Sequence, residues 1–256
     1  MIGLDDQVVQ LAVWRIDAEA PVPMDCLTPE DTARAAHFVR AEDRAASLAA
    51  RAGLRAILGE CLGELPQALR FNQAPLGKPF LAFPAASGVH FNLSHSQGLA
   101  ALAVARFPIG VDIEAVRPVE ADLAHAVFSP AELDEFGNLP LAQRREAFFL
   151  GWTRKEAVVK ALGSGLHAPL DRFSVSLTPG QPARLLAMGW RPGAVGQWQM
   201  ESFAVPEEHV GAIAADKAGW RLAVAGNPLL SVLGLAGPGG GVIHEVTAWP
   251  RSAACE

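Results

Sequence analysis

Two separate segments of the chain hold the side chains whose types and spacing are best suited to chemistry. The first, Ile-Gly-Val-Asp112-Ile-Glu114, has the pattern of a buried strand with carboxylates at alternate positions. The second, Trp-Thr-Arg-Lys-Glu156-Ala-Val-Val-Lys160, has the pattern of a helix. A strand directs residues i and i+2 to the same side, and a helix brings residues i and i+4 onto one face.

Together the two segments supply three carboxylates and one ammonium group that can converge on one point. Hard, oxygen-rich clusters of this kind suit Mg²⁺ that is bound partly through the phosphates of a substrate. An isolated Asp-x-Glu pair is more often the solvated face of an edge strand. Here Ile109, Val111 and Ile113 make the opposite face hydrophobic. The pattern therefore predicts a phosphoryl-transfer site.

The composition is that of a soluble globular protein. The chain has 256 residues, of which 50% are hydrophobic and 19% charged, enough for one large domain or two small ones. The longest apolar run, Leu99 to Ala105, is too short to span a bilayer, and no basic leader precedes an apolar core. We therefore expect neither a membrane anchor nor an export signal.

Charge and cysteine content indicate which partners and which cellular compartment to expect. The formal net charge of −6 argues against nucleic acid as a partner. The cysteines are scattered, with no Cys-x-x-Cys pair, which fits reduced thiols in a cytoplasmic protein. They are Cys26, Cys61 and Cys255.

Helix and strand patterns occur in both halves of the chain. Thr28-Pro29 marks a helix start, and an Ala- and Arg-rich helical region continues to about Leu62, either unbroken or broken near its middle. A second helix is expected over Leu141–Leu162, ending at Gly163. Residues 71–83 are predicted to be a loop. Strands are expected at Val8–Ile16, His90–Leu93, Leu99–Arg106, Ile109–Ala115, Phe173–Leu177, Gln197–Val205, Gly211–Ala215 and Arg221–Ala225.

This order of elements predicts an α+β fold with two similar lobes, although no sequence repeat supports the similarity. We expect an N-terminal lobe at residues 1–107 and a C-terminal lobe at 108–225 that carries most of the metal and catalytic residues. Residues 226–256 contain Asn-Pro and a Gly-Pro-Gly-Gly-Gly run, which predict a loosely ordered appendage.

Four blocks of the sequence resemble the signatures of Sfp-type 4′-phosphopantetheinyl transferases. In order, they are Gly77-Lys-Pro79, His90-Phe-Asn-Leu-Ser-His-Ser96, Ile109-Gly-Val-Asp-Ile-Glu114 and the stretch from Phe149 to Leu166. The resemblance covers roughly residues 8–225. It implies transfer of the phosphopantetheine arm of coenzyme A to a serine of an apo acyl or peptidyl carrier protein. It also implies Mg²⁺, release of adenosine 3′,5′-bisphosphate, and a monomer of two pseudo-symmetric lobes with coenzyme A in the cleft between them.

The resemblance assigns metal and catalytic roles to the two segments described first. Asp112, Glu114 and Glu156 would hold the metal. Glu156 would alternatively act as the general base for the incoming serine, a role that metal binding opposes because a cation lowers carboxylate basicity. Lys160 would donate a proton to the leaving phosphate or stabilise its charge. The competing interpretation of Lys160 is a surface i,i+4 pair with Glu156.

The resemblance also implies coenzyme A contacts. His95, with Ser94 beside it, would contact a phosphate, and Lys78 would contact a phosphate or the adenine from a loop fixed by Pro79. Lys155 is interpreted equally well as a phosphate contact or a solvated lysine. Trp152 either packs in the core or lines the pantetheine channel. A Ser-His pair also suggests a hydrolase, which we reject because the sequence has no G-x-S-x-G elbow.

A row of arginines offers a further phosphate site. Four of them and Ser47 would share one stripe, the arginines within an arc of about 60°, if the first helical region is unbroken. These arginines are Arg40, Arg44, Arg51 and Arg55. The alternative is a solvated face interleaved with acids. The resemblance favours Arg34 and Ser47 as nucleotide contacts. Where relatives can carry a basic residue before Ser47, this chain has Ala46. Binding of the 3′-phosphate would then be weaker, or would rely on Arg44 or Arg51.

Two other functions use the same residues. A Mg²⁺-dependent pyrophosphatase or nucleotide hydrolase would use water in place of the serine hydroxyl. A binding module for carrier protein or coenzyme A would have lost its chemistry, against which the intact acidic residues and Lys160 argue.

Overall fold

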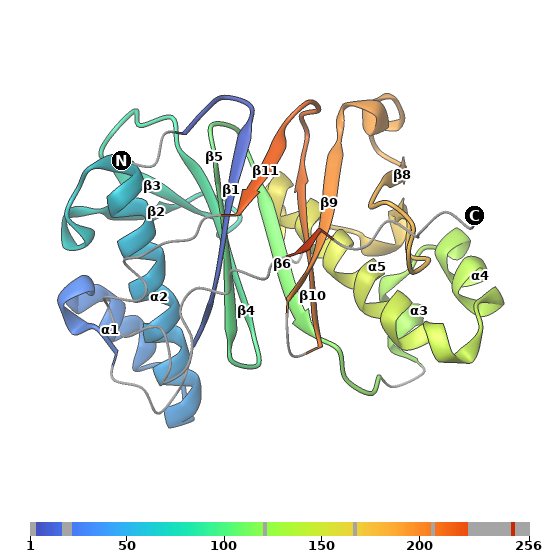
Figure 1. Cartoon of the computed structure of the whole chain (residues 1–256), viewed down its shortest axis with the longest axis horizontal. Coiled ribbons are helices and arrows are strands. Elements are labelled where there is room, and N and C mark those ends of the chain that lie inside the picture. The colour runs from blue at the N-terminus through green and yellow to red at the C-terminus, as the bar shows by residue number, and fades with distance from the viewer. Residues whose placement is uncertain are drawn as a thin grey trace.

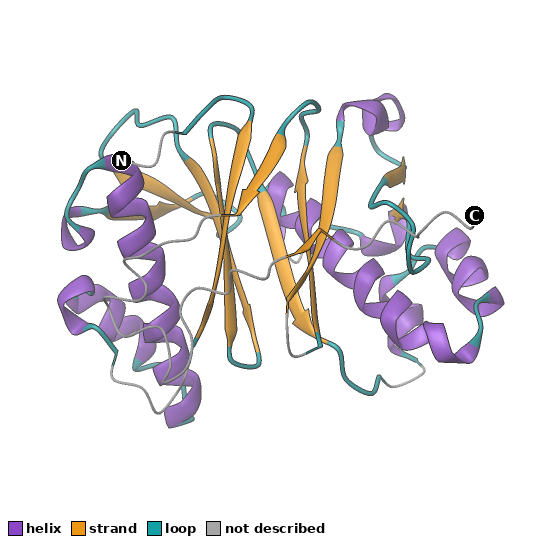
Figure 2. Cartoon of the chain, in the orientation of Figure 1, coloured by secondary structure: helices purple, strands orange, loops and turns teal. Residues whose placement is uncertain are grey.

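Two four-stranded sheets form the centre of the computed structural model, and a long helix lies on the outer side of each sheet (Figures 1 and 2). The structure describes residues 4–16, 22–119, 122–165, 168–205, 208–224 and 247–248. The two long helices, α2 (Ala41–Leu62) and α5 (Leu141–Leu162), each have 22 residues. This arrangement confirms the predicted α+β fold with two lobes.

The first sheet has the strand order β11-β1-β5-β4. Alternation along β1 explains how this sheet packs on both faces: Leu11 and Val13 contact the second sheet, whereas Ala12 and Trp14 contact the α2 side. The strands are β1 (Val8–Arg15), β4 (His90–Ser96), β5 (Leu99–Ala105) and β11 (Arg221–Val224). All neighbours are antiparallel except β1 and β11, which run parallel.

The second sheet has the order β12-β9-β10-β6, with antiparallel neighbours throughout. Its strands are β6 (Gly110–Ala115), β9 (Gln199–Val205), β10 (His209–Ala215) and β12 (Thr247–Ala248). The second lobe also holds α3 (Leu123–Val127), α4 (Pro130–Asn138) and the paired strands β7 (Phe173–Val175) and β8 (Leu185–Met188). Short 3-10 helices lie at Met24–Cys26, Pro66–Ala68, Leu170–Arg172 and Pro192–Gln197.

The first helical region is broken, in agreement with one of the two alternatives. Helix α1 (Pro29–Ala35) begins with a capping box formed by Thr28 and Asp31. A separate helix, α2, starts after Arg40. The four-arginine stripe is therefore wrong in one respect, because Arg40 lies before α2 and not on it.

The prediction of a loop over residues 71–83 is wrong. This segment belongs to a hairpin of β2 (Arg70–Gln73) and β3 (Pro79–Phe83). Its turn is closed by a bond from the Ala74 amide to the Lys78 carbonyl (2.8 Å) and contains Gly77 at φ +89°. Asn, Pro and Gly in the sequence indicated a loop, but they occupy a turn and a strand start that tolerate them.

The structure confirms the prediction for the second long helix and contains elements that were not predicted. Helix α5 spans the predicted residues and ends at Gly163 in the left-handed conformation. Helices α3 and α4 and strand β8 were not anticipated. Of the predicted appendage, only Thr247 and Ala248 are described, and they pair with β9. The rest, like Cys255, lies outside the described residues.

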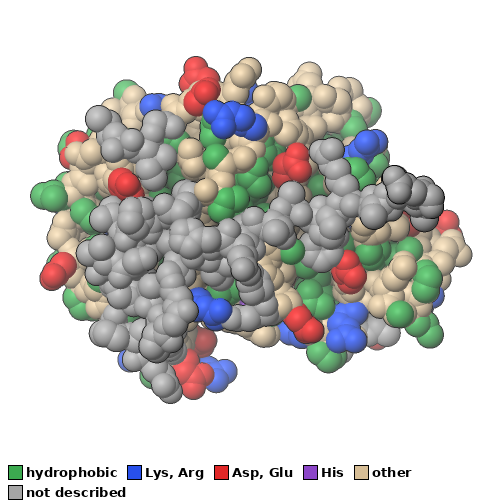
Figure 3. Space-filling view, viewed as in Figure 1, with side chains coloured by type: hydrophobic (Ala, Val, Ile, Leu, Met, Phe, Trp, Pro, Cys, Tyr) green, Lys and Arg blue, Asp and Glu red, His purple; other side chains and the backbone are tan. Residues whose placement is uncertain are grey.

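The described surface carries charges of both signs, and the two described thiols are buried. Acidic and basic side chains are interspersed over the described part of the face in Figure 3. Cys26 and Cys61 are free and buried, and burial raises the pKa of both thiols. Within the described ranges, no helix combines the length and apolar character needed to cross a membrane.

Candidate active site

Polar side chains of β4 link the edge of the first sheet to β6 of the second. Asn92 accepts a hydrogen bond from the Val111 amide (2.8 Å). Two residues further on, the Ser94 hydroxyl donates to Oδ1 of Asp112 (2.8 Å). Side chains thus take the place of a backbone ladder between β4 and β6, and they bring the Ser-His-Ser block against the Asp-x-Glu block.

The same alternation continues to the end of β4. The Ser96 hydroxyl donates to Oε2 of Glu114 (2.8 Å) and accepts from the Ala115 amide (3.3 Å). The backbone carbonyl of Ser96 lies 3.2 Å from Nε2 of His209. Ser96 and His209 were not predicted as site residues. The period-two spacing of Asn92, Ser94 and Ser96 was the signal that would have identified Ser96.

Helix α5 lies against β6 because Gly110 has no side chain. A Cβ at Gly110 would lie 2.0 Å from the Ala157 carbonyl oxygen and 2.4 Å from the Ala161 amide nitrogen. Any other residue would push the helix away from the strand. This close approach brings Lys160 to Asp112, with Nζ 2.5 Å from Oδ1 and 3.0 Å from the Ser94 hydroxyl.

Asp112 is an incompletely satisfied buried carboxylate. Its side chain is 4% exposed, and Lys160 and Ser94 both contact Oδ1. Oδ2 is buried and has no hydrogen-bond partner in the described part of the chain. Burial raises the pKa of Asp112, and Lys160 and Ser94 offset only part of this effect.

The neighbouring acids are coupled to Asp112. Burial raises the pKa of Glu114, and the charge of Asp112 raises it further. The pKa of Glu156 is raised by burial first, then by Asp112 and Glu114, while Lys160 lowers it. Lys160 is the cation common to the three carboxylates, and Arg117 acts on Glu114 as well, so the site keeps an excess of formal negative charge.

The predicted metal centre has the appropriate chemistry but not a preformed geometry. Over residues 4–224, apart from the short undescribed gaps, no group of three or more His, Cys, Asp or Glu side chains could hold a metal ion. The donor set nevertheless fits a hard dication, because it consists of carboxylate oxygens with excess negative charge and the orphaned Oδ2 of Asp112.

Lys78 and His95 lie near this junction. Lys78, in the turn between β2 and β3, donates to the carbonyls of Ile109 (3.0 Å) and Ala161 (3.1 Å), and burial lowers its pKa to about 8. Partial burial lowers the pKa of His95, and the charge of Lys160 lowers it further. Pro79 begins β3.

The predicted arginine row divides into buried and exposed members. Arg55 is buried and Arg51 partly so, and they donate to Asp31 at 2.6 Å and 2.7 Å. Arg40 pairs with Glu42 at the surface, and Arg44 is exposed and donates to the Phe38 carbonyl (3.2 Å).

The two nucleotide contacts favoured by the resemblance remain accessible. Arg34 is exposed and Ser47 half-buried. The positive charge of Arg34 acts on Arg51, which places the two near each other.

Neither interpretation of Lys155 is correct. Its ammonium group is fully buried and contacts Oε2 of Glu132 (2.7 Å) and the carbonyls of Leu170 (2.7 Å) and Phe173 (2.6 Å). With all three N–H groups used, Lys155 has none left for a phosphate. The capping box that begins α4, in which Ser129 precedes Glu132 by three residues, was the only sequence signal for this partner.

Trp152 packs as one of its two interpretations predicted. Its ring stacks on Phe148 with centroids 6.2 Å apart and an interplanar angle of 22°.

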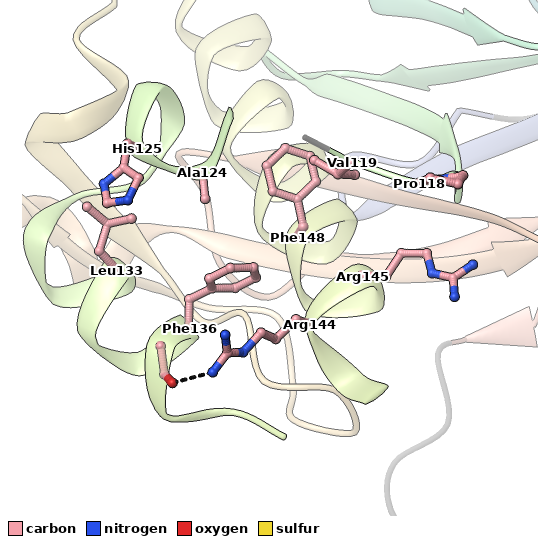
Figure 4. Close-up of a pocket in the computed structure, with 10 residues that line it drawn as sticks. Pro118, Val119, Ala124, His125, Leu133, Phe136, Arg144, Arg145 and Phe148 are labelled. Atoms are coloured by element: carbon pink, nitrogen blue, oxygen red, sulfur yellow. Dashed lines mark hydrogen bonds between the residues drawn. The ribbon is translucent and has the colours of Figure 1, made fainter. Parts of the chain in front are cut away.

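Two cavities border the second lobe near the end of β6. One, of about 630 Å³, has Phe136 and Phe148 on its walls and Arg144 bonded to the Gly137 carbonyl (2.6 Å; Figure 4). The other, of about 460 Å³, is lined in part by His209 and Glu146. Neither is lined by Asp112, Glu156 or Lys160, so the carboxylate site and these cavities are distinct features.

The fold and the site together define a two-lobed α+β protein with an acidic centre at the lobe junction. A profile described as "4′-phosphopantetheinyl transferase superfamily" matches residues 108–215. A second, described as "4′-phosphopantetheinyl transferase, N-terminal", matches residues 14–106.

Individual relatives agree with these profiles. The chain is 36% identical over 221 residues to the 4′-phosphopantetheinyl transferase HetI of Nostoc sp., covering 83% of this chain and 90% of that protein. It is 34% identical over 154 residues to a 4′-phosphopantetheinyl transferase of Bacillus subtilis, and 30% identical over 154 residues to Sfp of Bacillus subtilis strain 168. Each of these two matches covers 60% of this chain and 68% of the relative. The chain therefore belongs to the Sfp-type 4′-phosphopantetheinyl transferases and is a transferase enzyme.

Proposed function

We propose that this protein transfers the 4′-phosphopantetheine group of coenzyme A to a serine hydroxyl of an apo acyl or peptidyl carrier protein, and releases adenosine 3′,5′-bisphosphate. Phosphopantetheine transfer to carrier proteins is supported by the relatives and the family profiles. The observation that carries the chemical assignment is the contact of Lys160 and Ser94 with one oxygen of Asp112, while the other oxygen is buried without a partner.

In this proposal, Asp112, Glu114 and Glu156 hold Mg²⁺. Once bound there, the ion would supply charge neutralisation for the phosphoryl groups of the substrate. The excess negative charge of the three carboxylates supports this assignment, because a dication would balance it.

The side chains divide the remaining work. The serine oxygen forms a bond to phosphorus, and the bond from that phosphorus to the leaving adenosine bisphosphate oxygen breaks. Glu156 accepts the serine proton directly or through a water molecule, and the lower basicity of a metal-bound carboxylate favours the route through water. Lys160, held at the same junction, stabilises or protonates the leaving phosphate.

The nucleotide is proposed to lie beside the first lobe. Arg34, Arg44, Ser47, Arg51 and Pro79 are the contacts we assign to it, together with Ser94 and His95. Lys78 borders the same site, but two of its donors are bound to the carbonyls of Ile109 and Ala161. Because Ser94 donates to Asp112, its hydroxyl acts on coenzyme A chiefly through that carboxylate.

The organisation of the protein in the cell is also a proposal. We infer a cytoplasmic monomer with an N-terminal lobe at residues 1–107 and a C-terminal lobe at 108–225, and free, buried Cys26 and Cys61 suit a reducing compartment.

Incubation with coenzyme A, Mg²⁺ and a panel of apo carrier proteins, followed by mass spectrometry of the carriers, tests this function. We expect one or more carriers to gain a phosphopantetheine group, and a carrier whose acceptor serine is replaced by alanine to gain none. Cleavage of coenzyme A in the absence of any carrier would instead support the hydrolase alternative. Absence of both products would support a binding module.

A further inference from the structure

Lys78 connects the first lobe to two elements of the second lobe. It lies in the turn between β2 and β3, and its ammonium group donates to the carbonyls of Ile109 (3.0 Å) and Ala161 (3.1 Å). Ile109 directly precedes β6, and Ala161 lies in the last turn of α5. One side chain therefore joins the start of the strand to the end of the helix.

These two elements carry the charged groups of the active site. Ile109 is three residues before Asp112, and Ala161 directly follows Lys160. At this point the two backbones touch, since a Cβ on Gly110 would lie 2.4 Å from the Ala161 amide. The contact held by Lys78 is thus the one that determines how closely Lys160 approaches Asp112.

The position of Lys78 also suits the end of a helix. The last four carbonyls of an α-helix have no partner within it, and a cation there interacts favourably with the helix dipole. Ala161 provides one of these carbonyls, and a Cβ at the capping Gly163 would lie 3.2 Å from Cδ of Lys78, so the lysine stem packs along the helix end.

Holding a charged lysine here has an energetic cost, because burial disfavours the ammonium form. Burial lowers the pKa of Lys78 to about 8, and no carboxylate offsets this effect in the described residues. Two of its three N–H groups are already directed at carbonyl oxygens, away from the role of a simple phosphate ligand.

We infer that Lys78 is a positioning residue that holds the C-terminal turn of α5 on the start of β6 and thereby sets the approach of Lys160 to Asp112. Its effect on catalysis depends on the function proposed above. The contact itself does not depend on that function.

Substitution Lys78→Met keeps the length of the side chain and removes the donors. We expect kcat to fall roughly 10- to 100-fold, as for a misplacement of about 1 Å, with little change in KM for coenzyme A. The same loss is expected with 3′-dephospho-coenzyme A. Hydrogen exchange of peptides spanning residues 157–165 is expected to accelerate in the variant, without any substrate present.

The opposite pattern would overturn the inference. If KM for coenzyme A rises tenfold while kcat, the exchange of residues 157–165 and the use of dephospho-coenzyme A are unaffected, Lys78 is a phosphate ligand only. Because the exchange experiment needs no carrier protein, it decides the positioning role even if no carrier is modified, so the two proposals fail separately.

Two further variants guard against a folding artefact. Lys78→Arg retains a cation with several donors, and we expect it to preserve most of the protection of residues 157–165. Equal loss in the Arg and Met variants would count against the inference. Lys217→Met is the matched control, since Lys217 also donates to a carbonyl, that of Asp6 (2.8 Å), and contacts neither β6 nor α5 through that bond. We expect no change in exchange at residues 157–165 in this control.

Discussion

Asp31 and Asp112 are both buried aspartates beside basic side chains, yet their pKa values shift in opposite directions. Burial would raise the pKa of Asp31, but bonds from the Thr28 amide, Arg55 and Arg51 outweigh it and lower the pKa to about 2. Both oxygens are used: Oδ1 accepts from Arg51 (2.7 Å), and Oδ2 accepts from Arg55 (2.6 Å) and Thr28 (3.0 Å).

At Asp112 both contacts fall on one oxygen and the other has none, so the effect of burial prevails and the pKa rises. Asp31 has a structural role, because the protein itself uses the hydrogen-bonding capacity of both carboxylate oxygens. Asp112 keeps capacity for a ligand at a cost to the folded state. The number of donors, and not the presence of a basic partner, separates the two roles.

The largest expected effect is that of Asp112→Asn on catalysis. We expect kcat to fall by a factor on the order of 10³, because a charge that the transition state depends on is removed. The free energy of unfolding should change by less than about 1 kcal/mol, since the raised pKa shows that the ionised form is disfavoured in the fold. Carrier modification rates and urea denaturation measure the two quantities. Activity within a few-fold of the wild type would remove Asp112 from the site.

Asp31→Asn should produce the reverse result. It leaves two arginines without their carboxylate, one of them buried, and we expect a loss of about 3–5 kcal/mol in unfolding free energy with kcat of the folded enzyme unchanged. Urea denaturation followed by circular dichroism is the measurement. A loss below about 1 kcal/mol would put this network in the class of surface ion pairs.

Acidification should change the contributions of Asp31 and Asp112 to folding stability in opposite directions. The stabilisation from Asp31 is fully present above its unfolded pKa of 3.8 and is lost as pH falls through about 2, a change of about 2 kcal/mol. Asp112 has a raised pKa, so its ionised form costs stability at neutral pH, and protonation on acidification relieves that cost. We expect the following for the unfolding free energy of the metal-free protein as the pH falls. The wild type should lose stability relative to the Asp31→Asn variant and gain stability relative to the Asp112→Asn variant. For each variant, the difference in unfolding free energy from the wild type is plotted against pH. Slopes of the same sign for the two variants would contradict the comparison.

The smallest effects are expected from removing a hydroxyl group beside the active-site carboxylates or beside Asp31. Ser96→Ala removes the donor to Glu114, and we expect the Mg²⁺ concentration for half-maximal activity to rise roughly tenfold. Thr28→Ala, which removes a donor to Asp31, should cost about 1 kcal/mol of stability and leave the Mg²⁺ dependence unchanged. Magnesium titrations of both variants provide the test, and equal responses would show that Ser96 has no special relation to the site.

The sequence predicted what local periodicity and turn chemistry determine. The bounds of α5 follow from its helical pattern and from Gly163. The approach of Asp112 and Lys160 was predicted from the side-chain periodicity of a strand and a helix, and the structure confirms it. The convergence of Glu114 and Glu156 on one metal ion remains a prediction.

What the sequence did not reveal depends on contacts between distant segments. Lys155 turns into the core because α4 provides Glu132, and the 3-10 helix at Leu170–Arg172 and the start of β7 provide one carbonyl each. Strand β7 was predicted, but α4 and this 3-10 helix were not. Arg55 is buried because Asp31, 24 residues earlier, folds back onto it. A helical stripe shows which residues share a face, but not whether that face meets solvent or another element.

Strand β11 has a consequence for any attempt to divide this molecule. After β10 of the second sheet, the chain returns to the first sheet and places residues Arg221–Val224 alongside β1. A fragment ending at residue 215 would include both regions matched by the family profiles, yet it would leave one side of β1 without its parallel neighbour. Exposed strand edges invite pairing with other chains. The C-terminal part of the chain therefore completes the sheet of the N-terminal lobe. An N-terminal fragment without β11 would expose the edge of β1 and would be prone to self-association.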